Sequence, residues 1–179
     1  MANREALREL QARLASRLQA AQSEGMSVAW LAVMAGGQRF LLPLGQAGEI
    51  FPLANLQSVP YSKPWFRGVL NVRGSLLGVV ALADFIAAHA PAGADKPSVA
   101  AATDTSVVTL NALLEVNCAL QVESLAGLRG SDAFTASEAA SPDAPAYFGN
   151  RLTDAQGQQW QEINLRALAQ SPQFLSISA

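Results

Sequence analysis

The chain has 179 residues, of which 50% are hydrophobic and 15% are charged, and its formal net charge is −2. A chain this rich in apolar residues can fold, and it carries no basic stripe of the kind that nucleic-acid binding requires. Its length suits one domain, or two small lobes that share a core.

The N-terminus and the apolar runs bear on where the protein acts. The longest apolar run, residues 76–83, is far too short to span a bilayer. The first ten residues are charged and lack the apolar stretch of a signal peptide. The single cysteine, Cys118, cannot form an internal disulfide. We therefore expect a cytoplasmic protein without direct membrane insertion.

Residues 3–23 are predicted to form one amphipathic helix. Leucines and an alanine recur at spacings of three and four, at positions 7, 10, 14, 18 and 21, which places them on one face. Asn3 can cap the helix and Gly25 ends it. We expect residues 1–25 to be an accessory to a main domain of residues 26–175. The leucine face can dock either on this domain or on a partner.

From residue 28 onward the pattern is typical of short strands separated by turns. Many short strands at such spacing favour small barrels over a sheet with crossover helices. The predicted strands are 28–35 paired with 39–44, 69–72 paired with 76–82, then 107–110 and 113–122, and finally 147–152 paired with 158–163.

Two short helices are predicted among these strands. Residues 82–89 have helical spacing and end before Pro91, and Asn164 is a good N-cap for residues 165–170. The stretches 90–106 and 131–146 are rich in Ala, Ser, Asp and Pro without periodicity, which predicts surface loops.

The residues that carry catalytic chemistry are sparse. His89 is the single histidine and lies beside apolar residues of a short predicted helix, so we expect it to be partly buried at the surface. Cys118 lies in an apolar strand with no neighbouring cation to activate it. The acidic residues are scattered singly, and no phosphate-binding loop follows Gly36-Gly37. We therefore expect no enzyme activity, no metal site and no cofactor.

The segment 65–77 is unusual because it combines two aromatic residues, two arginines, two glycines and an asparagine. It resembles the signature of the CheW-like family, which runs G-V-[I/A]-N-[L/V]-R-G before apolar strand residues. The positions that match in register are Gly68, Val69, Asn71, Arg73 and Gly74, and Trp65 occupies the aromatic position upstream.

Other landmarks of the family follow in order. Glu49-Ile50, Val59-Pro60 and the segment 119–128 resemble family features, and the resemblance covers about residues 28–170. Three positions depart from the family pattern. Gly78 and Ala81 occupy positions where the family often has Pro and Asp, and Glu123 occupies the position of a later Asp. The N-terminal helix and the tail look most like the PilI-type members, which are associated with type IV pilus twitching motility.

The resemblance implies a mostly β fold of two small, SH3-like, five-stranded β-barrels that share a core. It also implies an adaptor that couples the cytoplasmic tip of a chemoreceptor to the regulatory domain of a CheA-type histidine kinase. The residues expected to contact a partner are Glu49, Asn71 and Arg73, while Trp65 could contact a partner or belong to the core. Arg73, at a hairpin tip, is expected to make few contacts within its own fold.

Two functions of other classes remain open from the residues alone. A small-ligand-binding β-barrel would enclose an apolar cavity with convergent polar groups. A nucleic-acid-binding barrel would need a basic, aromatic face, and the pI of about 5.3 argues against one. Within the adaptor reading, flagellar instead of pilus output is a further alternative.

Overall fold

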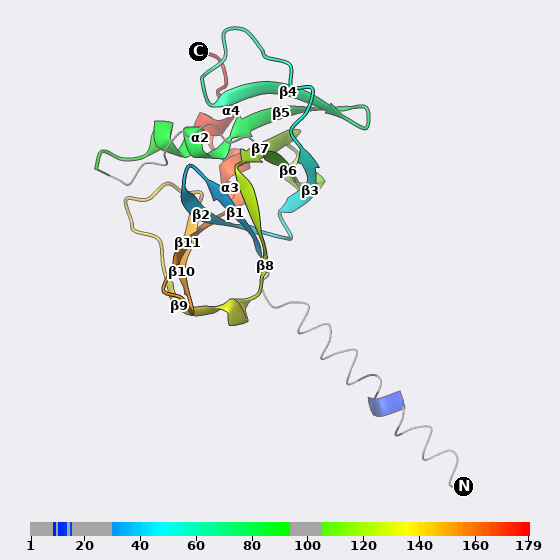
Figure 1. Ribbon diagram of the computed structural model, residues 1–179, viewed down its shortest axis with the longest axis vertical. Coiled ribbons are helices and arrows are strands. Elements are labelled where there is room, and N and C mark those ends of the chain that lie inside the picture. The colour runs from blue at the N-terminus through cyan, green and yellow to red at the C-terminus, as the bar shows by residue number, and fades with distance from the viewer. Residues whose placement is uncertain (1–8, 10, 14, 16–29, 94–104) are drawn as a thin grey trace.

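The computed structural model describes residues 9, 11–13, 15, 30–93 and 105–179. Figure 1 shows two lobes built on β-sheets, with short helices at their junction. The helices are α2 (Leu82–His89), α3 (Leu165–Gln170) and α4 (Pro172–Leu175), with 3₁₀ turns η1 (Ala112–Leu114) and η2 (Ser131–Ala133). The mostly β, two-lobed fold predicted from the sequence is confirmed.

One lobe is a six-stranded sheet with the order β8-β1-β2-β11-β10-β9. Neighbouring strands are antiparallel except β2 and β11, which are parallel. The family resemblance implied five strands for each lobe, and this sheet has a sixth. Its strands are β1 (Trp30–Ala35), β2 (Gln38–Pro43), β8 (Ser124–Arg129), β9 (Phe134–Glu138), β10 (Phe148–Asp154) and β11 (Gln159–Ile163).

The other lobe is a five-stranded sheet with the order β3-β6-β7-β5-β4. An isolated bridge between Gln57 and Val69 connects the chain after β3 to β4, so the two edges of this sheet meet. Gly68 permits that contact, because a Cβ at this position would lie 2.0 Å from the Gln57 carbonyl oxygen. Its strands are β3 (Ala47–Pro52), β4 (Phe66–Val72), β5 (Ser75–Ala81), β6 (Ser106–Leu110) and β7 (Cys118–Val122).

The two lobes share one apolar core, as the family resemblance implied. Strand β1 is buried on both faces: Leu31 and Val33 join the shared core, whereas Trp30 and Ala32 pack inside the six-stranded lobe. Strands of the five-stranded sheet supply Val80, Val108 and Leu120 to the same shared core, and helices α2 and α3 complete it with Phe85 and Leu168. Burial of this shared surface holds the lobes in one arrangement.

Local sequence signals explain most element boundaries. Gly36 and Gly37 both have positive φ, 58° and 72°, which suits the two-residue turn between β1 and β2. The Asn164 side chain accepts a hydrogen bond from the Ala167 N–H and caps α3, as predicted. His89 is half-buried and its Nδ1 lies 2.8 Å from the Phe85 carbonyl oxygen, in agreement with its expected structural role.

The turn between β10 and β11 is organised by the buried Asp154. Its carboxylate accepts hydrogen bonds from the Trp160 indole at 3.0 Å and from the backbone N–H groups of Gln156 and Gln158. The Trp160 bond, together with these backbone bonds and the charge of Arg129, holds the pKa of Asp154 below its usual range. This network fixes the third predicted hairpin.

Three predicted segments differ from the structure. Residues 113–122 are not one strand. The Asn111 side chain accepts a hydrogen bond from the Leu113 N–H and caps the start of the 3₁₀ turn η1, which precedes β7. The segment 119–128 is divided at Glu123 into β7 and β8. The predicted loop 131–146 contains η2 and β9, a polar strand that pairs with β10. An exposed edge strand needs no apolar alternation, so its pattern resembled a loop.

Two predictions fall mainly outside the described residues. Most of the N-terminal helix, residues 3–23, lies there, although Glu9, Gln11, Ala12, Arg13 and Ala15 are helical and exposed. Residues 94–104 of the predicted loop 90–106 lie there as well. The boundary at residue 25 therefore stays a prediction.

Candidate protein-interaction site

The β4–β5 hairpin tip presents two of the predicted contact residues. Arg73 and Gly74 form its two-residue turn, and both have positive φ, 52° and 83°. Such a turn matches the twist of the flanking strands. The Asn71 side chain accepts a hydrogen bond from the Gly74 N–H at 3.0 Å. Asn71 thus holds the turn that projects Arg73 outward.

Arg73 occupies a backbone region that arginine does not favour. The left-handed conformation costs a residue other than Gly, Asn or Asp about 1–2 kcal/mol. Asparagine at this position would adopt the turn more easily, because Asn-Gly is a preferred pair for it. Arginine at this position therefore lowers the stability of the fold locally. Backbone strain of this kind is concentrated at functional sites.

A bulge in β3 turns Glu49 toward the same tip. Ala47 pairs with Leu110 and Ile50 with Val108, so Gly48 and Glu49 both stand opposite Thr109. The Glu49 N–H donates to the Thr109 hydroxyl at 2.7 Å. Gly48 leaves room for that hydroxyl, since a Cβ there would lie 2.3 Å from it. Bulges of this kind redirect a side chain.

Arg73 and Glu49, 24 residues apart in sequence, form an ion pair. The guanidinium nitrogen lies 2.9 Å and 3.1 Å from the two carboxylate oxygens, and the guanidinium lies 5.4 Å from the Phe51 ring. The expectation that Arg73 makes few contacts within its own fold is thus corrected. Both side chains are exposed, at 73% and 58%. A pair this exposed contributes about 0–1 kcal/mol, so both charges stay available to a partner.

Trp65 lies in the core instead of at the surface. It is 3% exposed, and its ring packs edge-on against Phe85 at 5.0 Å. The Lys63 ammonium lies 5.9 Å from the ring. Of the four predicted contact residues, the structure brings Glu49, Asn71 and Arg73 together at one exposed tip. Trp65 directly precedes β4, and its ring contacts Phe85 of α2.

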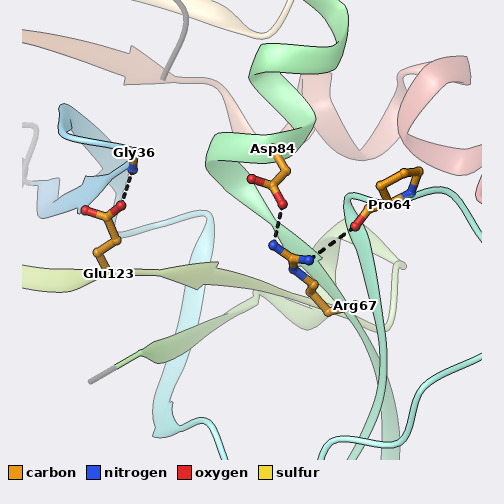
Figure 2. A network of polar contacts seen from close by, with 5 residues as sticks. All are labelled: Gly36, Pro64, Arg67, Asp84 and Glu123. Carbon is orange, nitrogen blue, oxygen red and sulfur yellow. Dashed lines mark hydrogen bonds and ion pairs between the residues drawn. The ribbon is translucent and has the colours of Figure 1, made fainter. Parts of the chain in front are cut away.

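Other charged side chains make contacts within the fold, and Figure 2 shows those of Arg67 and Glu123. Arg67 pairs with Asp84 on α2 and also lies 3.5 Å from the Pro64 carbonyl oxygen. Glu123, between β7 and β8, accepts a hydrogen bond from the Gly36 N–H at 2.7 Å. Its carboxylate thus links the end of the five-stranded sheet to the β1–β2 turn of the other lobe. Although Glu123 stands where the family pattern has Asp, it keeps a carboxylate at this junction.

Other features of the described residues give no sharper site. They contain no cluster of His, Cys, Asp or Glu that could hold a metal ion, and no helix among them is long and apolar enough to cross a membrane. A hollow of about 830 Å³ lies between the end of α2, the β1–β2 turn and the segment after β9. Charged side chains of both signs line this hollow, so it favours no one class of ligand. They are Arg39, Glu138, Asp143 and Arg151.

Sequence reasoning missed two residues that shape the tip, Thr109 and Phe51. Thr109 supports the Glu49 bulge, and Phe51 lies under the Arg73 guanidinium. The glycine before Glu49 is the signal that could have suggested a bulge. No local pattern indicates Thr109, because its partner is 60 residues away.

Comparisons with known proteins identify similar sequences and a similar fold. A family model described as the CheW-like domain matches residues 29–173. The protein PilI of Pseudomonas aeruginosa is 36% identical over 74 residues, which are 41% of this chain and 42% of that relative's length. The crystal structure of the scaffolding protein TtCheW from Thermoanaerobacter tengcongensis superposes with a TM-score of 0.58 and 13% identity, covering 77% of this chain and 89% of that one.

Proposed function

The chain belongs to the family of CheW-like domains, and from that premise we propose that it is a cytoplasmic, non-enzymatic adaptor that couples a methyl-accepting chemoreceptor to a CheA-type histidine kinase. The family consists of adaptors of chemotaxis signalling. The partial similarity to PilI supports a type IV pilus system, with control of twitching motility as the output.

The observation that carries the proposal is the exposed pair of Glu49 and Arg73 on two backbone irregularities. A β-bulge directs one side chain and a strained turn directs the other, and the two charges meet in solvent. Neither the bulge nor the pair is needed to bury the core. This arrangement therefore supports a role in recognition.

The chemistry of the pair suits a polar partner surface. The Arg73 guanidinium can bind a carboxylate in a forked geometry, and the Glu49 carboxylate can accept hydrogen bonds from a partner's donors. Since the internal pair contributes so little stability, exchanging it for contacts with the partner costs little.

Coupling requires contacts that differ between signalling states. A receptor can bias the kinase only to the extent that its own states bind the adaptor differently. The shared core of the two lobes gives the adaptor one rigid arrangement, through which contacts at one surface position another.

Two substitutions at Arg73 test this site. Arg73→Asn creates an Asn-Gly turn, so we expect a melting temperature equal to or above that of the wild type. Arg73→Glu reverses the charge and should melt within a few degrees of the wild type. Both should weaken binding to the receptor tip or to the kinase regulatory domain, by roughly 30-fold for Arg73→Glu, which corresponds to about 2 kcal/mol.

Calorimetric titration of the full chain with each partner measures this effect. Arg166→Gln is the matched control, because Arg166 is an exposed arginine of α3 away from the tip. Unchanged affinity of both Arg73 variants for both partners would remove the hairpin tip from the site. A large fall in melting temperature would make Arg73 structural.

A further inference from the structure

The shared apolar core is exposed along one edge of the six-stranded sheet. Leu125 and Leu128 of β8 are 40% and 69% exposed. They pair with Val33 and Leu31 of β1, which both belong to the shared core. Residues paired across an antiparallel ladder point to the same face of the sheet. Leu125 and Leu128 therefore continue the core face onto β8, the outermost strand of this sheet in the described residues.

The chain enters the sheet beside these leucines. Trp30, the first residue of β1, pairs with Arg129 of β8 on one side and with Pro43 of β2 on the other. Leu128 directly precedes Arg129. Leu44, which is 39% exposed, directly follows Pro43. Exposed leucines thus lie on both sides of the point where the preceding segment joins β1. We call them the leucine edge: Leu44, Leu125 and Leu128.

The segment that precedes Trp30 matches the leucine edge in chemistry and in width. The sequence predicts an amphipathic helix over residues 3–23, with leucines at positions 7, 10, 14 and 18 on one face. Those leucines lie outside the described residues. Glu9 and Arg13 are described as helical and exposed, and helical spacing places them opposite the leucines. A helix is about 10 Å wide, and β2 and β8, two strand spacings apart, are separated by about 10 Å.

The short connection favours the chain's own helix over other occupants of the leucine edge. Residues 24–29 join the predicted helix to Trp30 and include Gly25, and a segment of this length reaches about 20 Å. Such a tether keeps the helix beside the leucine edge at an effective concentration on the order of millimolar. A partner or a second copy at micromolar concentration competes poorly with it. Since an amphipathic helix gains most of its stability from packing its apolar face, the contact stabilises the helix as well.

We propose that the leucine face of residues 3–23 packs, within the same chain, on the leucine edge. The helix then covers the exposed border of the shared core and shields an apolar patch that would otherwise be free to associate with other proteins. The leucine edge belongs to the six-stranded lobe, whereas Glu49 and Arg73 belong to the other lobe. The contact requires no signalling partner, so it is separate from the proposed function.

A spin label on the helix tests this contact in the full chain. Gln11→Cys places the label on an exposed helical residue, and the wild-type chain treated with the same reagent controls for labelling of the buried Cys118. The amide NMR signals of β8 should broaden, whereas those of the β4–β5 tip should not. The double substitution Leu125→Ser and Leu128→Ser should remove most of the broadening. Leu76→Ser, which removes a leucine of 58% exposure from the five-stranded lobe, should leave it unchanged.

Each outcome supports or overturns the contact. Unbroadened β8 signals in the spin-labelled full chain would overturn it, whatever the stability of the variants. A mixture of spin-labelled chain with isotopically labelled, unmodified chain reports contacts between copies. Broadening of β8 in that mixture would place the helix on a second copy and contradict packing within the chain. Circular dichroism of the double variant should show a loss of helical signal as the helix loses its packing, and an unchanged signal would contradict the proposal.

Discussion

At the scale of single residues, burial decides what Cys118 can do. The side chain is 5% exposed in β7, and its thiol lies 3.7 Å from the Ala119 carbonyl oxygen. Burial raises the pKa of this thiol to about 12 from an ordinary value of 9.0. Because the thiolate is the reactive form, the pKa shift and the lack of access both suppress its reactivity.

We therefore predict that Cys118 reacts slowly with thiol reagents in the native protein. At neutral pH the thiolate fraction should lie far below that of an ordinary thiol, because burial raises the pKa of Cys118. Labelling followed by mass spectrometry, in buffer and in denaturant, measures the rates. Fast labelling of the native chain would contradict the burial of this strand.

Single residues also show how far the sequence could be interpreted. The sequence predicted that Arg73 lies at a hairpin tip, because the residue types of a turn are adjacent in the chain. It could not predict that Arg73 pairs with Glu49, since that contact depends on a bulge in β3 and on the packing of two distant strands. Trp65 stayed ambiguous for the same reason, because only the placement of α2 decides that its ring is buried.

At the scale of elements, Gly68 controls how the edges of the five-stranded sheet meet. Its φ is 135°, and the Gln57 carbonyl occupies the space that a side chain would need. Gly74 offers a comparison within the same hairpin, since its φ of 83° is also positive but nothing lies within 4 Å of the point where a Cβ would stand.

We predict that Gly68→Ala destabilises the protein by roughly 3 kcal/mol, through backbone strain together with loss of the Gln57–Val69 bridge. Gly74→Ala should cost about 1 kcal/mol, from the backbone conformation alone. Urea denaturation of both variants gives the difference. Equal losses of stability in Gly68→Ala and Gly74→Ala would show that the contact with Gln57 contributes nothing to the free energy of unfolding.

Strands β1 and β2 were predicted from a clear apolar pattern, and β10 from the turn residues 153–157 that follow it. Strand β9 was missed because its residues are largely exposed, so nothing in their polarity distinguishes a strand from a loop. Asn111 indicated a turn or bulge, but the predicted strand began at Leu113, because Leu113 and Leu114 look like strand residues, so the extent of η1 was missed. The Asn111 side chain, which accepts from the Leu113 N–H, determines the turn instead.

The N-terminal helix is a separable element in our interpretation. The family model of the CheW-like domain begins at residue 29, and the core cluster of the described residues runs from Leu31 to Phe174. Removing residues 1–24 should therefore leave a folded β-protein with a two-state unfolding transition. Circular dichroism and thermal melting test this, and an unfolded truncated chain would show that the helix is integral.

At the scale of the whole molecule, two lobes around one core form a body with several distinct surfaces. The Glu49–Arg73 tip is polar and exposed, and it lies at one end of the β4–β5 hairpin. The family pattern predicted the two lobes and the shared core. It could not predict the sixth strand of one sheet, which depends on the polar segment that became β9.

The most direct measurement asks whether this chain joins a receptor to a kinase. The kinase regulatory domain is immobilised, and the cytoplasmic tip of the receptor is added with and without the full chain. We predict that the receptor tip is retained when the chain is present, in a complex whose mass by analytical ultracentrifugation contains all three components. Retention should fall with Arg73→Glu. If the two partners instead compete for the chain, so that each displaces the other, the proposed adaptor function is wrong.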